Sequence, residues 1–143
     1  MGALNALVNL TVLSLPKTQV TGELGALKAL VNLTELHLDE TQVTGDLGAL
    51  KALNLTELLL SNMQLTGDLG ALNALVNLTV LSLPKTQVTG ELGALKALVN
   101  LTELHLDETQ VTGDLGALKA LNLTELLLSN MQLTGDLGAL NAL

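Results

Sequence analysis

The chain has 143 residues, of which 48% are hydrophobic and none is aromatic, so its core is predicted to consist almost entirely of leucine, valine and alanine. Its 14 acidic and 6 basic residues give a formal net charge of −8, which argues against nucleic acid and anionic membranes as partners. The sequence contains no cysteine, which excludes disulfides and thiolate metal sites.

The N-terminal stretch 1–16 is uncharged and fairly apolar, as targeting signals often are. It has no basic segment, however, and residues 2–16 recur internally at 70–84, so a copied structural repeat explains it better than a signal peptide. The longest uncharged runs reach about 16 residues and are too short for a membrane span. We expect a soluble protein with no signal peptide or transmembrane segment, and the sequence indicates no compartment.

A phrase of the form GALxAL begins at seven glycines spaced 22 or 23 residues apart, namely Gly2, Gly25, Gly48, Gly70, Gly93, Gly116 and Gly138. Residues 2–69 and 70–137 are identical at all 68 positions, and 138–143 restart the same block. This predicts a single solenoid domain over 1–143, with six repeats and a partial seventh. The two blocks are identical even at Lys, Glu and Gln residues that are expected to be exposed. This predicts an engineered (designed or consensus) sequence, and a very recent duplication is the alternative.

One repeat, residues 24–45, shows which elements to expect. Its leucines first fall three apart, at 24, 27 and 30, which suits a 3₁₀-like or irregular segment. In LTELHL at 33–38, inward leucines then alternate with Glu35 and His37, which predicts a short strand. Such a strand cannot bury its apolar face alone, so neighbouring repeats must stack it into a parallel sheet. Gly45 and its equivalents Gly22 and Gly67 are predicted to allow a sharp turn.

These segments resemble a known family. LTELHLDETQV at 33–43 resembles the leucine-rich-repeat segment L-x-x-L-x-L-x-x-N-x-L, and LTGDLGAL at 65–72 is similar to the plant-type pattern L-x-G-x-I-P-x-x-L-G-x-L. The resemblance covers essentially the whole chain. It implies an α/β-type leucine-rich-repeat solenoid, with a parallel β-sheet on the concave face, 3₁₀-like or irregular convex segments and a curved right-handed superhelix. It also implies a concave face that binds proteins or peptides.

The chain departs from the family pattern in two ways. The family asparagine is replaced by Thr18, Thr41, Thr86 and Thr109, and by Met63 and Met131. A Thr hydroxyl satisfies only part of the asparagine's hydrogen bonds and Met satisfies none, so we expect packing and backbone hydrogen bonds to hold the turns. Leu-Gly replaces Ile-Pro, which argues against the second small sheet of plant-type repeats. The 22-residue repeat at Leu53-Asn54-Leu55 also lacks a valine, and we expect this to change the local curvature.

Two groups of polar residues are candidate sites. They are Glu35, His37 and Asp39 with Glu57 of the next repeat, and their copies Glu103, His105, Asp107 and Glu125. Imidazole beside carboxylates suits a divalent cation or acid–base chemistry. A single histidine per group, with side chains expected to diverge along the strand, favours a solvated face instead. We therefore predict no catalytic, cofactor-binding or metal-binding residues, and no enzyme.

Other repeated residues have structural explanations. Asn-Leu-Thr occurs six times and is formally a glycosylation acceptor, but we expect its amide to bond to neighbouring backbone. Stacked Gln and Thr, as in Gln42 and Thr44, should form outward ladders, and regular Thr arrays bind ice in some plant-type repeat proteins. Met63 and Met131 are expected to fill the core.

Three functions compete. The first is a structural scaffold without catalytic activity, which self-associates as a homo-oligomer or end-to-end assembly through uncapped terminal repeats at 1–7 and 137–143. The second is protein or peptide binding on the concave face, although that face lacks the Trp, Tyr and Arg of strong binding hot spots. The third is a metal or ice surface. The concave positions of the first block are Val12, Ser14, Pro16, Glu35, His37, Asp39, Glu57, Leu59 and Ser61.

Overall fold

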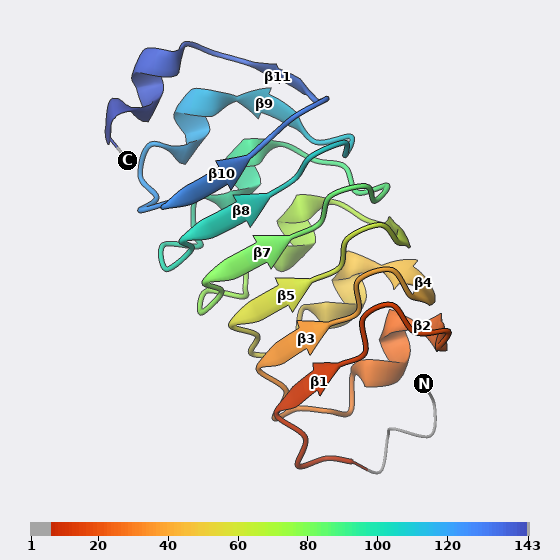
Figure 1. Ribbon diagram of the computed structural model, residues 1–143. Coiled ribbons are helices and arrows are strands. Elements are labelled where there is room, and N and C mark those ends of the chain that lie inside the picture. Colours follow the sequence, from red (N-terminus) through yellow and green to blue (C-terminus); the bar gives the residue numbers. More distant parts are fainter. Residues whose placement is uncertain (1–6, 143) are drawn as a thin grey trace.

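The computed structural model describes residues 7–142 and shows one coil per repeat, stacked into a solenoid (Figure 1). The main sheet is parallel and has the strand order β1-β3-β5-β7-β8-β10, as predicted. Equivalent residues of successive repeats lie opposite one another, such as Leu13, Leu36 and Leu58. Its strands are β1 (Val12–Ser14), β3 (Glu35–His37), β5 (Glu57–Leu59), β7 (Val80–Ser82), β8 (Glu103–His105) and β10 (Glu125–Leu127).

The core is built from stacked leucines, because alternate side chains of each strand point to opposite faces of the sheet. Leu33, Leu36 and Leu38 are fully buried, while Glu35 and His37 between them stay partly exposed. The leucines of the following segment, spaced three apart, close the core from the other side. The predicted inward and outward positions of the strand are confirmed.

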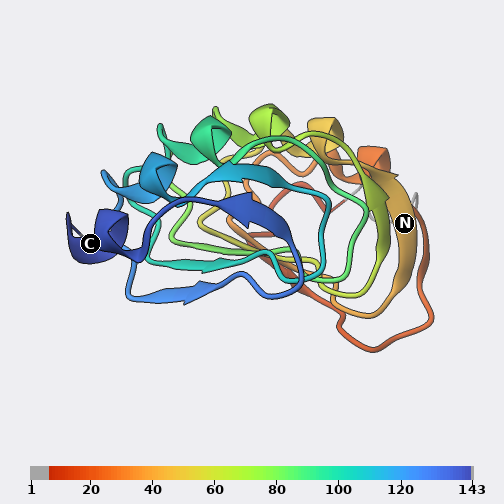
Figure 2. The same ribbon diagram turned by 90° about the horizontal axis from the view of Figure 1, so that it is seen from above.

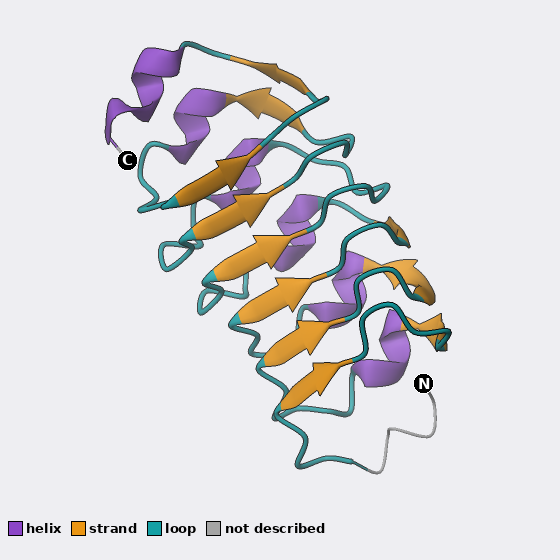
Figure 3. Cartoon of the chain, viewed as in Figure 1, coloured by secondary structure: helices purple, strands orange, loops and turns teal. Residues whose placement is uncertain are grey.

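Each repeat returns through a short 3₁₀ helix on the side opposite the main sheet (Figures 2 and 3). This confirms the prediction made from leucines spaced three residues apart. Asp46, Asp68, Asp114 and Asp136 cap four of these helices by accepting a hydrogen bond from the glycine amide two residues later. The helices are η2 (Leu24–Leu27), η3 (Leu47–Leu50), η4 (Leu69–Leu72), η5 (Leu92–Leu95), η6 (Leu115–Leu118) and η7 (Leu137–Ala142).

A second set of parallel strands follows the main-sheet strands and precedes the 3₁₀ helices in chain order. The prediction against a second sheet is therefore wrong. One part contains β2 (Thr21–Glu23), β4 (Gln42–Asp46) and β6 (Gln64–Thr66), and another contains β9 (Thr112–Asp114) and β11 (Gln132–Thr134). Two isolated bridges join the intervening coils. The pairing uses backbone groups that precede the Leu-Gly step, because β2 ends at Glu23 before Leu24 begins η2. Replacing Ile-Pro therefore leaves this ladder intact.

The turn after each main-sheet strand contains a non-glycine residue with φ between +54° and +59°. These residues are Lys17, Glu40, Asn62, Lys85, Glu108 and Asn130. At the next position Thr41 is buried, and its hydroxyl donates to the Leu38 carbonyl oxygen at 2.8 Å. In the short repeat Met63 takes this position and is 4% exposed. Threonine thus satisfies the turn locally and Met63 packs in the core, as predicted, whereas Met131 is only partly buried.

The last coil of the described chain exposes apolar side chains. At the C-terminal end Leu137 is 77% exposed, and a hollow is lined by leucines that include Leu126 and Leu133. Most of the first terminal segment, 1–7, lies outside the described residues. No helix in residues 7–142 is long and apolar enough to cross a membrane.

Candidate binding surface on the main sheet

The side chains that project from the main sheet away from the core form three columns, which we call the sheet face. The first column starts at Val12, the second at Ser14 and the third just after the strand, at Pro16. Backbone pairing aligns the members of the first two columns from strand to strand. The columns are Val12, Glu35, Glu57, Val80, Glu103 and Glu125; Ser14, His37, Leu59, Ser82, His105 and Leu127; and Pro16, Asp39, Ser61, Pro84, Asp107 and Ser129.

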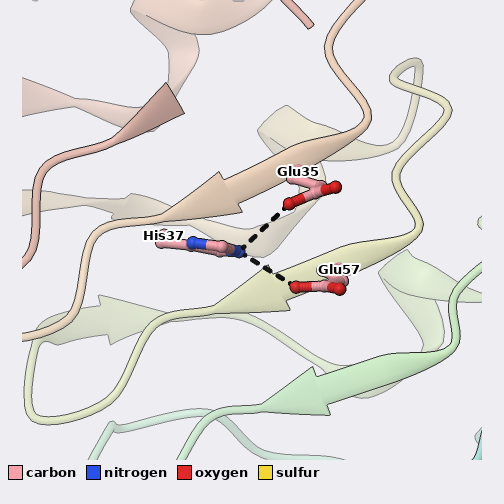
Figure 4. Close-up of side chains that lie close together, drawn as sticks. All are labelled: Glu35, His37 and Glu57. Carbon is pink, nitrogen blue, oxygen red and sulfur yellow. Dashed lines mark hydrogen bonds and ion pairs between the residues drawn. The ribbon is translucent and has the colours of Figure 1, made fainter. Parts of the chain in front are cut away.

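Figure 4 shows that Glu35, His37 and Glu57 come together. His37 Nε2 lies 3.1 Å from Glu57 Oε1 and 3.9 Å from Glu35 Oε1. The prediction that side chains diverge along the strand is wrong for Glu35 and His37. Glu57 joins them because the pairing of β3 with β5 puts it directly opposite Glu35. Two like charges opposite each other repel, and the imidazole between them offers the carboxylates a hydrogen-bond donor.

The second block repeats this arrangement with small differences. His105 Nε2 lies 2.8 Å from Glu125 Oε2, and Glu103 completes the group. The hydrogen bond with His105 lowers the pKa of Glu125, and a second one with Glu103 adds to the effect. Glu125 therefore keeps its negative charge at neutral pH.

The aspartates of the third column belong to a separate contact. The Ser61 hydroxyl donates to Asp39 Oδ2 at 2.7 Å, and Ser129 donates to Asp107 Oδ2 through both its hydroxyl and its amide. Burial raises the pKa of Asp107, but the hydrogen bonds from Ser129 outweigh it and the pKa is lowered overall. The sequence placed these aspartates with the histidines, whereas the structure pairs them with serines of the next coil.

The chemistry open to each cluster is limited by its place on the sheet. One imidazole nitrogen and two carboxylate oxygens lie within 4.8 Å of one another, a donor set that a divalent cation accepts. Two hollows within residues 7–142 are lined by residues of the terminal coils, such as Leu133 and Leu10, and neither includes a cluster residue. The clusters therefore lie on an open face and present charge to whatever lies across the sheet.

Two other predictions are confirmed by hydrogen bonds between coils. The Asn32 and Asn100 amides donate to the carbonyl oxygens of Val8 and Val76, at 2.9 and 3.0 Å. Threonines of the second sheet form an outward column, as where Thr89 donates to the Gly67 carbonyl oxygen at 3.3 Å.

The short repeat changes the asparagine pattern. Asn77 donates to the side chain of Asn54 at 2.7 Å instead of to a backbone carbonyl. In the longer repeats a valine precedes this asparagine and its carbonyl oxygen accepts the hydrogen bond, whereas Leu53 stands before Asn54. The effect of this shortening on curvature stays a prediction.

No family model matches this sequence, and no curated protein does. Solved structures match it well. The leucine-rich-repeat ectodomain of the Arabidopsis thaliana membrane receptor kinase GASSHO1/SCHENGEN3, in complex with CASPARIAN STRIP INTEGRITY FACTOR 2, has a TM-score of 0.81 at 28% identity and covers 99% of this chain. An internalin from Listeria monocytogenes has a TM-score of 0.80 at 25% identity over 99% of this chain. A plant ice-binding protein has a TM-score of 0.82 at 26% identity over 98%.

This chain spans 18%, 48% and 47% of those three proteins, respectively. What they share with it is the coil itself, with one strand of a parallel sheet in each repeat. The spacing of its leucines, its stacked parallel strands and these structural neighbours together show that the chain has the fold of a leucine-rich-repeat solenoid.

Proposed function

We propose that the sheet face binds a protein or peptide segment and has no catalytic role. The observation that carries the proposal is the combination of side chains on this face. It presents partly exposed carboxylates beside apolar side chains such as Val12 and Leu127, which are 44% and 45% exposed. The matched receptor ectodomain was solved with a bound factor, which supports the proposal by analogy of fold.

The face also has a suitable shape for this role. Its strands run side by side across six coils, and its side chains alternate with buried leucines, so the platform is held rigid by the core. A rigid platform lowers the entropy lost when a partner binds. Whether the two identical blocks arose by design or by duplication does not alter the proposal, since both carry the same side chains on this face.

Selection from a display library of random peptides tests the proposal. Peptides selected on the chain are expected to lose binding to Leu59→Arg combined with Leu127→Arg, which changes the sheet face in both blocks. The matched control is Val31→Arg with Val99→Arg, which changes exposed valines outside the face, 63% and 56% exposed. Selection of no peptide, or loss of binding only in the control, would contradict the proposal.

A second candidate function is a structural scaffold that associates end to end. It is favoured by the exposed leucines of the last coil and by the sequence itself, because residues 2–24 repeat the segment 70–92 that packs on the preceding coil. A second copy therefore carries a coil that matches this end. Light-scattering mass is expected to grow with concentration, and Leu133→Glu in the last coil to prevent the growth. A constant mass near 14.8 kDa would remove this candidate.

A further inference from the structure

The two acidic clusters recur at a fixed interval along the sheet. β3 and β8 carry equivalent residues and are three strands apart in the sheet order, as are β5 and β10. Adjacent strands are about 4.8 Å apart, so equivalent carboxylates lie about 14 Å from each other. Between the clusters the sheet face presents Val80, Ser82 and Pro84, none of which carries a charge, and Lys85 follows in the turn after β7. Along the stack the face therefore alternates between acidic and neutral segments.

The carboxylates of these clusters retain capacity for a cationic partner. A carboxylate has about four acceptor positions, and the imidazole occupies one of them on Glu57. The side chains of Glu35, Glu57 and Glu125 are 35%, 36% and 49% exposed. Three aspartates that precede the 3₁₀ helices differ, because Asp46, Asp68 and Asp114 already accept from glycine amides as helix caps.

The lysines of the chain do not neutralise this face. Four of them, Lys28, Lys51, Lys96 and Lys119, follow the 3₁₀ helices on the opposite side of the solenoid. The other two, Lys17 and Lys85, lie in the turns after β1 and β7. Within residues 7–142 the ion pairs of the carboxylates involve histidine and no lysine. The negative charge of the clusters is therefore left for a partner.

We infer that the sheet face takes an extended basic segment whose lysine or arginine side chains lie about four residues apart, one at each acidic cluster. This rests on the proposed function and specifies its partner. An extended chain advances about 3.3–3.6 Å per residue, so four residues span the 14 Å between clusters. The segment runs across the strands, and its intervening residues lie over Val80 and Leu59.

Short synthetic peptides of alanine, serine and threonine, each with two lysines and one tryptophan, test this spacing. The chain has no aromatic residue, so tryptophan anisotropy reports only the peptide. The peptide with lysines four positions apart is expected to bind about two- to five-fold more tightly than the one with adjacent lysines, the range expected for an additional exposed ion pair. A chelator present throughout excludes divalent cations from the clusters.

Variants separate the bivalent contact from general charge. Glu35→Gln with Glu57→Gln removes one cluster, and Glu103→Gln with Glu125→Gln removes the other. Either pair is expected to abolish the preference for spaced lysines. Glu23→Gln with Glu91→Gln removes two charges from outside the face and is expected to leave the preference unchanged. Circular dichroism of each variant checks that the solenoid is retained.

The outcomes distinguish the inference from the proposed function. A preference for spaced lysines that either cluster variant abolishes supports the inference. Equal binding of both peptides, or equal loss in the control variant, overturns it. If library selection yields neutral or acidic peptides that bind the sheet face, the inference fails while the proposed function stands. If no peptide binds in either experiment, both fail.

Discussion

Glycines at one position of each repeat are required by two constraints at once. Gly67 has a φ of +116°, and a Cβ built there would lie 2.8 Å from Asp46 Oδ1 and 2.9 Å from the Leu47 amide nitrogen. Residues with a Cβ rarely adopt this backbone conformation. The Leu47 amide nitrogen belongs to the first residue of η3 and cannot move without shifting that helix. By contrast, Gly25 has no atom within 4 Å of its ideal Cβ and no positive φ.

We therefore expect Gly67→Ala to lower the free energy of unfolding by about 1–3 kcal/mol, through backbone strain and the close contact. Gly25→Ala is the matched control and is expected to change stability little. Urea unfolding followed by circular dichroism measures both. Equal stability of the two variants would show that the turn at Gly67 is not constrained as described.

The capping aspartates offer a second comparison between equivalent positions. Asp46 accepts from the Gly48 amide at 2.8 Å, whereas Glu23 at the same place in the preceding repeat makes no cap hydrogen bond. Asp46→Ala is expected to cost about 0.5–2 kcal/mol of stability, as for other N-cap residues. Glu23→Ala should cost clearly less in the same urea titration, and a similar cost for both would argue against capping.

At the scale of the element, identical strands differ only in their place in the stack. Leu58 and Leu126 have the same neighbours in the sequence, but Leu58 is fully buried between coils and Leu126 is only partly buried in the last one. Because each coil contacts only its neighbours, stability depends on how many neighbours a residue has.

Leu58→Ala is expected to destabilise the 143-residue chain by about 2–5 kcal/mol through lost burial and the cavity left behind. Leu126→Ala is expected to cost less than half as much, since solvent already reaches that site. Thermal unfolding of both variants measures the difference. Equal destabilisation would show that the last coil is covered in solution.

The strands and 3₁₀ helices could be predicted from the sequence because burial imposes a period on side chains. Leu33, Leu36 and Leu38 reveal a strand, and leucines three apart reveal the 3₁₀ helix. The second sheet has a weaker signal, because only Val43 is buried in Gln42-Val43-Thr44 and a glycine follows, which is too short an alternation to reveal a strand. The left-handed turn residues were also missed, since Lys17 and Glu40 are not typical of positive φ.

The candidate site could be predicted in composition but not in geometry. The sequence names Glu35, His37 and Glu57, but their approach depends on the register between β3 and β5 and on side-chain rotamers. The same register separates Asp39 from the histidine and pairs it with Ser61. Side-chain contacts between coils follow only once the coils are aligned in space.

At the scale of the whole molecule, charge is distributed unevenly around the solenoid. The sheet face carries six of the 14 acidic residues, while four of the six lysines follow the 3₁₀ helices on the opposite side. The six carboxylates of the sheet face attract a basic partner to it, and salt weakens the effect. The solenoid is thus a rigid support for one recognition surface.

Photo-crosslinking of a library-selected peptide tests the central claim most directly, because it locates the bound peptide on the chain. A benzophenone on the peptide is expected to label residues of the sheet face, such as Leu59 and Leu127, as read by mass spectrometry of the digested complex. Labelling confined to the 3₁₀ side, for example around Val31 or Lys51, would contradict the assignment of the sheet face as the binding surface.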